Sequence, residues 1–129
     1  MPDTDIKTIA TAYIQAVGDG RLDEVAAYLH PDLTFETPGG AALTGPDGYL
    51  AALRRLQPII ARNEIRSVLA EDDRVCVLYD FVTDTPVGPV ASVELLTIQD
   101  GRIASVFLLF DRTRWPEVLE QLKARTPSA

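Results

Sequence analysis

The sequence predicts one α+β domain over residues 1–129, in which helices pack on one face of an antiparallel sheet. Apolar residues recur at helical spacing in three segments before residue 60 and in one near the C-terminus. Four segments after residue 63 are rich in β-branched and aliphatic residues, as strands are. Short turn signals separate them, so they indicate a meander. A chain of 129 residues suits a single domain with a substantial core.

Each expected helix carries an apolar stripe. The first ends at Gly18 and Gly20, and its stripe consists of Ile6, Ile9, Ala10, Tyr13, Ile14 and Val17. A short second helix ends near His30-Pro31 and carries Leu22, Val25, Ala26 and Leu29. The third begins near Pro46, a residue favoured in a first turn, and its apolar residues are Tyr49, Leu50, Leu53 and Leu56. The last expected helix covers residues 115–124.

A short strand is expected over residues 33–37, before the breaker Pro38-Gly39-Gly40. The longer strands are expected at residues 64–70, 75–82, 90–98 and 103–110. Both faces of the last two strands are apolar, whereas a sheet with one solvated face would alternate. The second face must therefore be covered by a partner subunit or by the last helix, and we expect a homodimer formed through the sheet.

Composition excludes several classes of function. The net charge of −7 and the pI of about 4.6 argue against nucleic acid or an anionic membrane as a partner, because both attract clustered Lys and Arg. The single Cys76 and single His30 leave no ligand set for a His/Cys metal site. No signal peptide pattern and no apolar run of spanning length is present. We therefore expect a cytoplasmic protein without a cofactor.

Glu94 stands in the middle of the otherwise apolar strand 90–98. Because side chains alternate along a strand, its face is shared by Val90, Ser92, Leu96 and Ile98. An ionised carboxylate is costly to bury there, so Glu94 should be ion-paired, protonated or exposed to a cavity. In a cavity it would be a general acid or base whose pKa is raised by desolvation. The alternative is a structural acid paired with an arginine or placed at a dimer interface.

Asp80 is a second acid within an apolar strand and shares its face with Cys76, Leu78 and Val82. If the strand register brings Asp80 and Glu94 together on the cavity face, one of the two carboxylates would hold a proton, which suits acid/base chemistry. The alternative is an aspartate at an edge or interface that faces solvent, because the face depends on the register.

Four stretches, in order, resemble a known superfamily; they are AYIQAVGDGRLD (12–23), LHPDLTFETPGG (29–40), VASVELLTIQDGRI (90–103) and LFD (109–111). With the order of helices and strands, they resemble the nuclear-transport-factor-2-like superfamily, and within it the SnoaL-like polyketide cyclases and the ketosteroid isomerases. The resemblance implies a cone-shaped α+β fold whose N-terminal helices pack on the concave face of a curved sheet. The last helix would be an addition to that fold.

The resemblance also implies roles for three residues. Tyr13 matches the family's tyrosine on the first helix, and Glu94 matches the acid on the late strand, as Glu rather than Asp. Thr37 falls where the ketosteroid isomerases have their catalytic base, and threonine cannot take up a proton at neutral pH. The steroid-isomerase mechanism is therefore not expected. In the cyclase-like members the late-strand acid is itself the base, a role that Glu94 can fill.

Two hypotheses about function follow. The first is cofactor-free chemistry of isomerase or cyclase type on a small apolar carbonyl compound, in which Glu94 moves the proton, Asp80 assists and Tyr13 stabilises the oxyanion. The second is a non-catalytic module that binds a small apolar ligand, or a dimer whose pocket has closed. Further residues would line the pocket or simply fill a core: Phe35, Thr37, Leu53, Leu56, Leu78, Phe107 and Leu109. An open cavity beside Glu94 would favour a ligand site.

Overall fold

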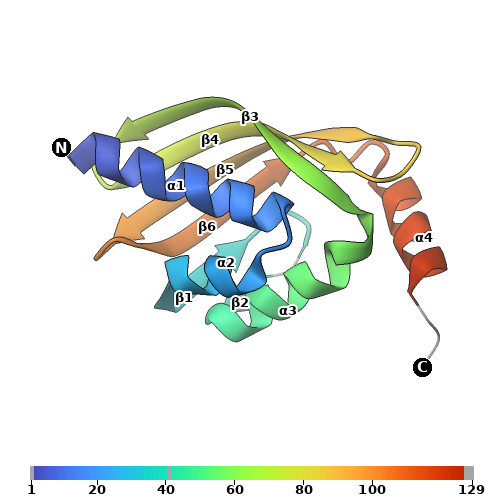
Figure 1. Cartoon of the computed structure of the whole chain (residues 1–129), viewed down its shortest axis with the longest axis horizontal. Coiled ribbons are helices and arrows are strands. Elements are labelled where there is room, and N and C mark those ends of the chain that lie inside the picture. The colour runs from blue at the N-terminus through green and yellow to red at the C-terminus, as the bar shows by residue number, and fades with distance from the viewer. Residues whose placement is uncertain (1, 41, 127–129) are drawn as a thin grey trace.

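The computed structural model describes residues 2–40 and 42–126, with side chains from Ile6 onward. Four α-helices and one six-stranded sheet make up this part of the chain (Figure 1). The helices are α1 (Pro2–Gly18), α2 (Leu22–Tyr28), α3 (Pro46–Leu56) and α4 (Trp115–Arg125), and the short 3-10 helix η1 covers Gln57–Ile59. The strands are β1 (Leu29–Glu36), β2 (Ala42–Thr44), β3 (Ile60–Glu71), β4 (Arg74–Thr83), β5 (Pro89–Gln99) and β6 (Arg102–Phe110). The predicted α+β architecture is confirmed.

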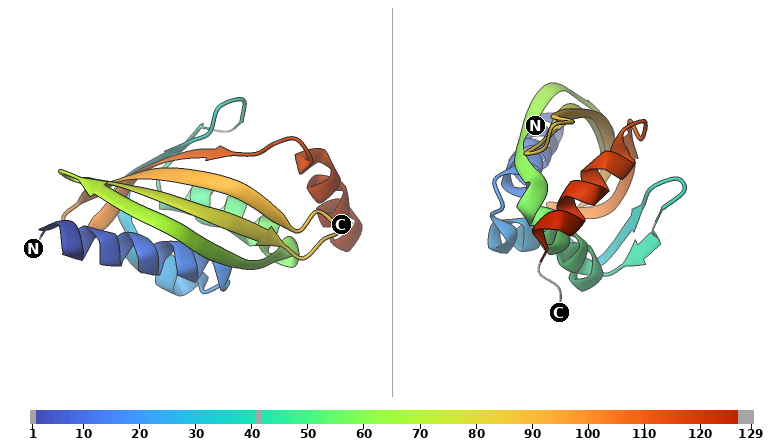
Figure 2. Two further views of the ribbon diagram at one scale, coloured as in Figure 1. Left: turned by 90° about the horizontal axis from the view of Figure 1, so that it is seen from above. Right: turned by 90° about the vertical axis from the view of Figure 1, so that its right-hand side faces the viewer.

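The strands lie in the order β2-β1-β6-β5-β4-β3 and form a curved, unclosed sheet (Figure 2). The meander from β3 to β6 is antiparallel, as predicted, and one of its hairpins turns at Asp100-Gly101, where both residues have positive φ. Strand β1 instead runs parallel to β6, with Phe35 opposite Val106. The sheet is therefore mixed at this one pair.

Helix α1 packs along the concave side of the sheet, against β3 and β4 (Figures 1 and 2). Four residues of its apolar stripe, Ala10, Tyr13, Ile14 and Val17, are at most 7% exposed, and the other two, Ile6 and Ile9, are partly buried against the same core. Strand β4 contributes Val75 and Val77, which are fully buried, to the same core. The stripe predicted for the first helix therefore marks the face that holds the helix on the sheet, because burial of apolar area drives this packing.

Side chains of β5 alternate between the two faces of the sheet. The concave face of β5 carries Val90, Ser92, Glu94, Leu96 and Ile98, which are all buried. The register places Glu94 between Val77 of β4 and Leu108 of β6. Since directly opposed residues share a face, Val77, Glu94 and Leu108 all point to the concave side.

The convex face of the sheet carries exposed apolar side chains. Leu78, Val93 and Leu109 stand directly opposite one another on three neighbouring strands, and Leu78 and Leu109 are 42% and 46% exposed. A second row on this face consists of Leu69, Cys76, Leu95 and Phe107. We call these seven residues the convex patch. It is larger than the isolated exposed apolar residues that any surface carries.

Helix α4 does not cover the convex patch. It stands at one end of the sheet (Figure 2), where the Trp115 ring packs against Phe110 and Phe81, with centroids 5.0 and 6.2 Å apart. Phe81 and Phe110 belong to the concave side, which α4 therefore closes at its end. The sequence suggested that either a partner subunit or the last helix covers the second apolar face. In the structure, the last helix does not cover it.

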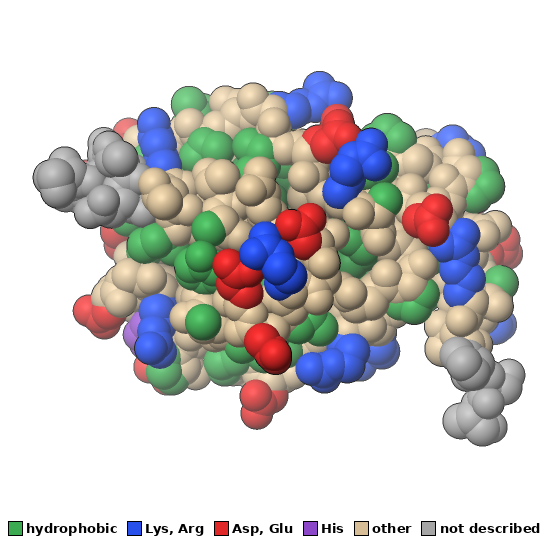
Figure 3. All heavy atoms as spheres, viewed as in Figure 1, with side chains coloured by type: hydrophobic (Ala, Val, Ile, Leu, Met, Phe, Trp, Pro, Cys, Tyr) green, Lys and Arg blue, Asp and Glu red, His purple; other side chains and the backbone are tan. Residues whose placement is uncertain are grey.

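Acidic and basic side chains are interspersed on the face shown in Figure 3, without an extended basic area. Among the described residues, several acidic and basic side chains form ion pairs, such as Arg62 with Glu64 and Arg66 with Asp80. Exposed pairs of this kind contribute little to stability. Within the described residues, no helix is both long enough and apolar enough to cross a membrane.

Candidate functional site

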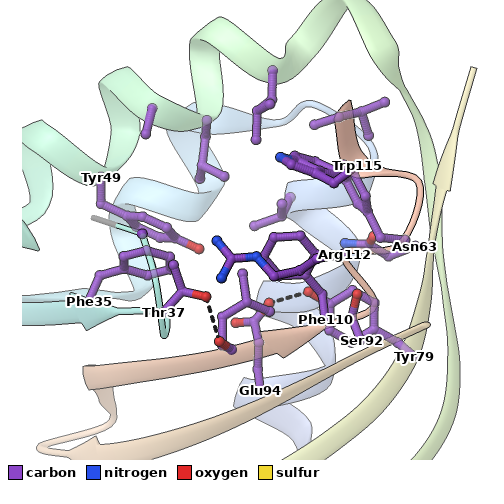
Figure 4. Close-up of a pocket in the computed structure, with 18 residues that line it drawn as sticks. Phe35, Thr37, Tyr49, Asn63, Tyr79, Ser92, Glu94, Phe110, Arg112 and Trp115 are labelled. Atoms are coloured by element: carbon purple, nitrogen blue, oxygen red, sulfur yellow. Dashed lines mark hydrogen bonds between the residues drawn. The ribbon is translucent and has the colours of Figure 1, made fainter. Parts of the chain in front are cut away.

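A cavity of about 280 Å³ lies between the concave face of the sheet, helix α3 and the segment that leads into α4 (Figure 4). Most of its wall is apolar and aromatic, including Val17, Phe35, Leu53, Leu56, Phe81, Leu108, Phe110 and Trp115. The polar groups on the wall are few: Thr37, Tyr49, Asn63, Tyr79, Ser92, Glu94 and Arg112. A largely apolar cavity with a few convergent polar groups is typical of sites for small molecules, and its volume is close to the lower end of their range of ~300–1,000 Å³.

Glu94 supplies the carboxylate on this wall, and only 5% of the surface of this residue is exposed. The Tyr79 hydroxyl donates a hydrogen bond to its Oε2, and the Tyr13 hydroxyl donates to its Oε1 over 3.4 Å. Within the described part of the chain, no Lys, Arg or His makes an ion pair with Glu94. The ion-pair alternative for Glu94 is therefore not what the structure shows.

Three tyrosine hydroxyls converge on this carboxylate. Beyond its bond to Glu94, the Tyr13 hydroxyl shares a hydrogen bond with the Tyr49 hydroxyl. The Tyr49 ring is itself held by Phe35, which stacks on it with centroids 4.9 Å apart. The three rings come from α1, α3 and β4, so the packing of helices on the sheet assembles the network.

Burial raises the pKa of Glu94 to about 7, and the hydrogen bonds from Tyr79 and Tyr13 partly oppose that rise. Burial also raises the pKa of Tyr13, Tyr49 and Tyr79, and the negative charge of Glu94 adds to the rise. At neutral pH the tyrosines therefore remain protonated donors, while Glu94 exists in both its charged and its neutral form. A group with a pKa near the working pH can both take and return a proton.

Four of the residues predicted to line a pocket do lie on the cavity wall: Phe35, Thr37, Leu53 and Leu56. The Thr37 hydroxyl donates a hydrogen bond of 2.8 Å to the Leu108 carbonyl. The hydroxyl proton of Thr37 is therefore bonded to the backbone of the sheet. Thr37 is the residue that matches the position of the catalytic base in the ketosteroid isomerases.

The prediction that Asp80 shares the cavity with Glu94 is wrong. Asp80 stands opposite Ala91, on the convex side of β4, and accepts hydrogen bonds from Arg66 Nε and Nη2 at 3.0 and 2.7 Å. The cavity side of β4 carries Tyr79 and Phe81 instead. The prediction assigned the wrong face of β4 to the cavity. Because side chains alternate along a strand, that one error misplaced every side chain of β4.

The same error applies to Leu78, Phe107 and Leu109, which were predicted to line the pocket and instead belong to the convex patch. The residues of β6 on the cavity wall are Leu108 and Phe110, one position further along in each case. Because both faces of β4 and β6 are apolar, hydrophobicity alone could not show which face is concave.

Tyr13 and Glu94 are brought together, as expected, but Tyr13 is fully buried and does not contribute to the cavity wall. Tyr49 and Tyr79, which sequence reasoning missed, do reach the wall. Tyr49 was assigned only to the apolar stripe of its helix. The alternation of Val75, Val77, Tyr79 and Phe81 was the signal that could have placed Tyr79 beside Glu94.

The described residues contain no group of three or more His, Cys, Asp or Glu side chains placed to hold a metal ion. The polar residues of the cavity suit hydrogen bonding and proton transfer.

A model of the SnoaL-like domain matches residues 10–106 of the chain. No curated protein matches the sequence significantly. Several solved structures share the fold. An LEH-like epoxide hydrolase from M. tuberculosis is 21% identical, with 96% of each chain covered and a TM-score of 0.78. A protein from Kribbella flavida is 24% identical, with 92% of this chain and 96% of that chain covered and a TM-score of 0.79.

A candidate polyketide cyclase from Sinorhizobium meliloti is also similar, at 24% identity, with 79% of this chain and 94% of that chain covered and a TM-score of 0.69. Identities this low establish a shared fold and leave the reaction open, because one fold serves many activities. The domain model, in contrast, matches the sequence itself over most of its length, from α1 into β6. The chain therefore belongs to the SnoaL-like domain family.

Proposed function

We propose that the cavity binds a small apolar carbonyl compound and that Glu94 moves a proton on it, in cofactor-free chemistry of isomerase or cyclase type. The observation that carries this proposal is the setting of Glu94: a buried carboxylate on the wall of an apolar cavity, bonded only to tyrosine hydroxyls, with a pKa near 7. Strongly perturbed acids of this kind in a cavity are typical of acid/base sites.

In the proposed reaction, the Glu94 carboxylate takes a proton from a carbon next to the substrate carbonyl. The C–H bond breaks, an O–H bond forms on Glu94, and the electron pair moves onto the carbonyl oxygen. The Tyr79 hydroxyl lies on the cavity wall, and once Glu94 holds the proton, Tyr79 can turn its single O–H from the carboxyl group to that oxygen as its charge develops. Return of the proton to another carbon completes an isomerisation. In a cyclisation, the enolate carbon instead attacks a second carbonyl carbon of the same molecule, the electron pair of that C=O bond moves onto its oxygen, and Glu94 gives its proton to that oxygen.

Tyr13 acts through Glu94 in this scheme, since it touches the carboxylate from behind the cavity wall. Asp80 has no part in it. The likeness to a candidate polyketide cyclase is consistent with the cyclase version of the chemistry.

The alternative is a cavity that binds a small apolar ligand without reacting with it. One observation favours this alternative: both oxygens of Glu94 already accept hydrogen bonds from the protein, and the residue is only 5% exposed. A ligand would have to reach the lone pairs that Tyr79 and Tyr13 leave free on a carboxylate that is almost wholly covered.

The test uses 2-tetralone, a small apolar ketone with exchangeable protons beside its carbonyl. In D₂O, the parent protein should accelerate the loss of the C1 proton signal in NMR spectra, and the rate should rise with pH through about 7 as Glu94 ionises. Glu94→Gln should lower the acceleration by about 100-fold or more, because a general base typically contributes ~10²–10⁴ in rate.

Asp80→Asn is the matched control, since it removes the other strand acid from the opposite face of the sheet. It should keep the exchange activity of the parent. Chemical shift changes on binding without any exchange would support the non-catalytic alternative. Equal losses in both variants would contradict the role of Glu94.

We also propose that the convex patch is the interface of a homodimer. Its central row joins Leu78, Val93 and Leu109 across three strands, and the two leucines expose 42% and 46% of their surface. A second copy presents the same patch and can cover it symmetrically, as in most homodimers. Burial of the apolar side chains of both patches would offset the cost of association.

Sedimentation at micromolar concentration should show a dimer for the parent and a monomer for Leu109→Glu, because a charge in the middle of an apolar interface is costly to bury. Leu119→Glu is the matched control: Leu119 is 45% exposed on α4, away from the sheet, and its variant should remain dimeric. A monomeric parent protein would refute the dimer.

A further inference from the structure

Arg112 is a second charged residue on the wall of the cavity that contains Glu94. It belongs to the segment between β6 and α4, and it is one of the residues on the cavity wall (Figure 4). One guanidinium nitrogen, Nη1, donates to the Pro38 carbonyl, and the group lies 5.2 Å from the centroid of the Phe110 ring. These two contacts hold a positive charge on the wall of a mainly apolar cavity.

The loop after β1 approaches this guanidinium closely at Gly39. A Cβ at Gly39 would lie 2.6 Å from Arg112 Nη1, whereas one at Gly40 would make only an ordinary contact with Nη2, at 3.6 Å. Gly39 also has a φ of +72°, which other residues rarely adopt. Gly39 therefore lets the loop backbone lie against the arginine head group.

Among the described residues, the charge of Arg112 has no carboxylate partner. Six of the other arginines make ion pairs within 4.0 Å in the described part of the chain, and Arg112 makes none there. The neighbouring Asp111 accepts a hydrogen bond from the Thr113 backbone N–H instead. A guanidinium has five N–H donors, so most of those on Arg112 remain after Nη1 has bonded to Pro38.

The cavity wall therefore carries two chemically different groups, the Glu94 carboxyl on β5 and the Arg112 guanidinium from the segment after β6. The rest of the wall is mainly aromatic and aliphatic, with Phe35, Phe81 and Phe110 among its residues.

We propose that Arg112 binds the carboxylate of an amphipathic ligand, whose apolar body fills the cavity and whose reacting carbon lies beside Glu94. This inference rests on the proposed function and names its substrate class: small apolar carboxylic acids. The planar fork of a guanidinium matches a carboxylate, which it can bind through two parallel hydrogen bonds.

A carboxylate suits the site better than a phosphate. Arg112 is the one Lys or Arg among the described residues that line the cavity, so it balances a single negative charge. A phosphate group carries ~1.5–2 negative charges at neutral pH, and the excess would face a protein whose own net charge is −7.

The test compares 4-phenylbutyrate with its neutral isostere 4-phenylbutyramide, by titrations followed in protein NMR spectra. The parent should bind the acid about tenfold more tightly than the amide, because hydrogen bonds between charged groups are stronger than neutral ones. Arg112→Gln should bind both probes equally, at the affinity the parent has for the amide. Arg112→Lys keeps the charge without the fork and should retain only part of the preference.

Arg102→Gln is the control for net charge, because Arg102 is exposed at the far end of β6 and outside the cavity wall. It should leave the tenfold preference intact. Equal binding of acid and amide by the parent, or tighter binding of phenethyl phosphate than of the acid, would overturn the proposal while leaving the ligand site in place. Failure of the parent to bind either probe in the cavity would overturn this proposal and count against the proposed function as well.

Discussion

Replacing Glu94 by glutamine is expected to remove a loss of stability that the parent protein suffers as the pH rises. Burial raises the pKa of this carboxyl from 4.5 to about 7, so the folded protein keeps the proton to a higher pH than the unfolded chain does. The free energy of unfolding of the parent should therefore fall between about pH 4.5 and pH 7 and change no further above that range, as far as Glu94 is concerned. At 1.36 kcal/mol per pH unit, the shift corresponds to about 3 kcal/mol.

The measurement is a set of urea melts of parent and variant at pH 4 and pH 8. At pH 4 both side chains are neutral and have the same shape, so the two proteins should be about equally stable. At pH 8 the Gln variant should be more stable, by up to about 3 kcal/mol. Taking the difference between the two proteins cancels the titration of every other group.

Asp80→Asn gives the contrasting result that makes this measurement specific. Its carboxylate pairs with Arg66, so at pH 8 the Asn variant should be slightly less stable than the parent, by less than ~1 kcal/mol, because Arg66 is exposed. If Glu94→Gln is clearly less stable than the parent at pH 8, Glu94 is a structural partner of the tyrosines, and the catalytic proposal loses its main support.

The architecture could be predicted because each element carries its own local signal. The apolar stripe of α1 follows a helical period, and Asp100-Gly101 marks a hairpin between two alternating strands. Glu94 was found for the same reason: a lone acid in an apolar strand is visible in the sequence and is costly unless it has a purpose. Such signals depend on neighbours in the chain and need no knowledge of the tertiary structure.

The parallel pairing of β1 with β6 has no local signal. About seventy residues separate Phe35 from Val106, its partner in the sheet, and only the complete fold brings them together. The very short strand β2 was missed because its three residues are too few to show a period.

Some cavity residues could be predicted from local signals, whereas others depend on the tertiary fold. Phe35 and Leu53 were placed correctly, because each element has only one apolar face to offer. Tyr79 and Phe110 were missed in favour of Leu78 and Leu109, because β4 and β6 are apolar on both faces and the direction of sheet curvature decides which face is concave. Arg112 lies in a connecting segment, where no periodic pattern indicates which way its side chain points.

Gly18→Ala is expected to destabilise the protein by about 2–3 kcal/mol, the cost of overpacking a close contact. Helix propensity predicts the opposite sign, since alanine is favoured over glycine within helices by ~1 kcal/mol. The contact decides: a Cβ on Gly18 would lie only 2.4 Å from the backbone nitrogen of Asn63 in β3. A backbone atom inside a sheet cannot move aside as a flexible side chain can, so α1 would have to shift away from the sheet. That shift would also draw Tyr13 away from Glu94.

Gly48→Ala in α3 is the matched control, because its Cβ would meet nothing nearer than Leu43 Cδ2 at 3.9 Å. With no collision to oppose helix propensity, this variant should be more stable than the parent by up to ~1 kcal/mol. Urea melts of both variants beside the parent should therefore show changes of opposite sign for one and the same substitution. The loss of the Tyr13 hydrogen bond should in addition raise the pKa of Glu94 in Gly18→Ala above about 7, which the pH dependence of its melts would reveal. Stabilisation by both substitutions would show that α1 does not approach β3 as closely as 2.4 Å implies.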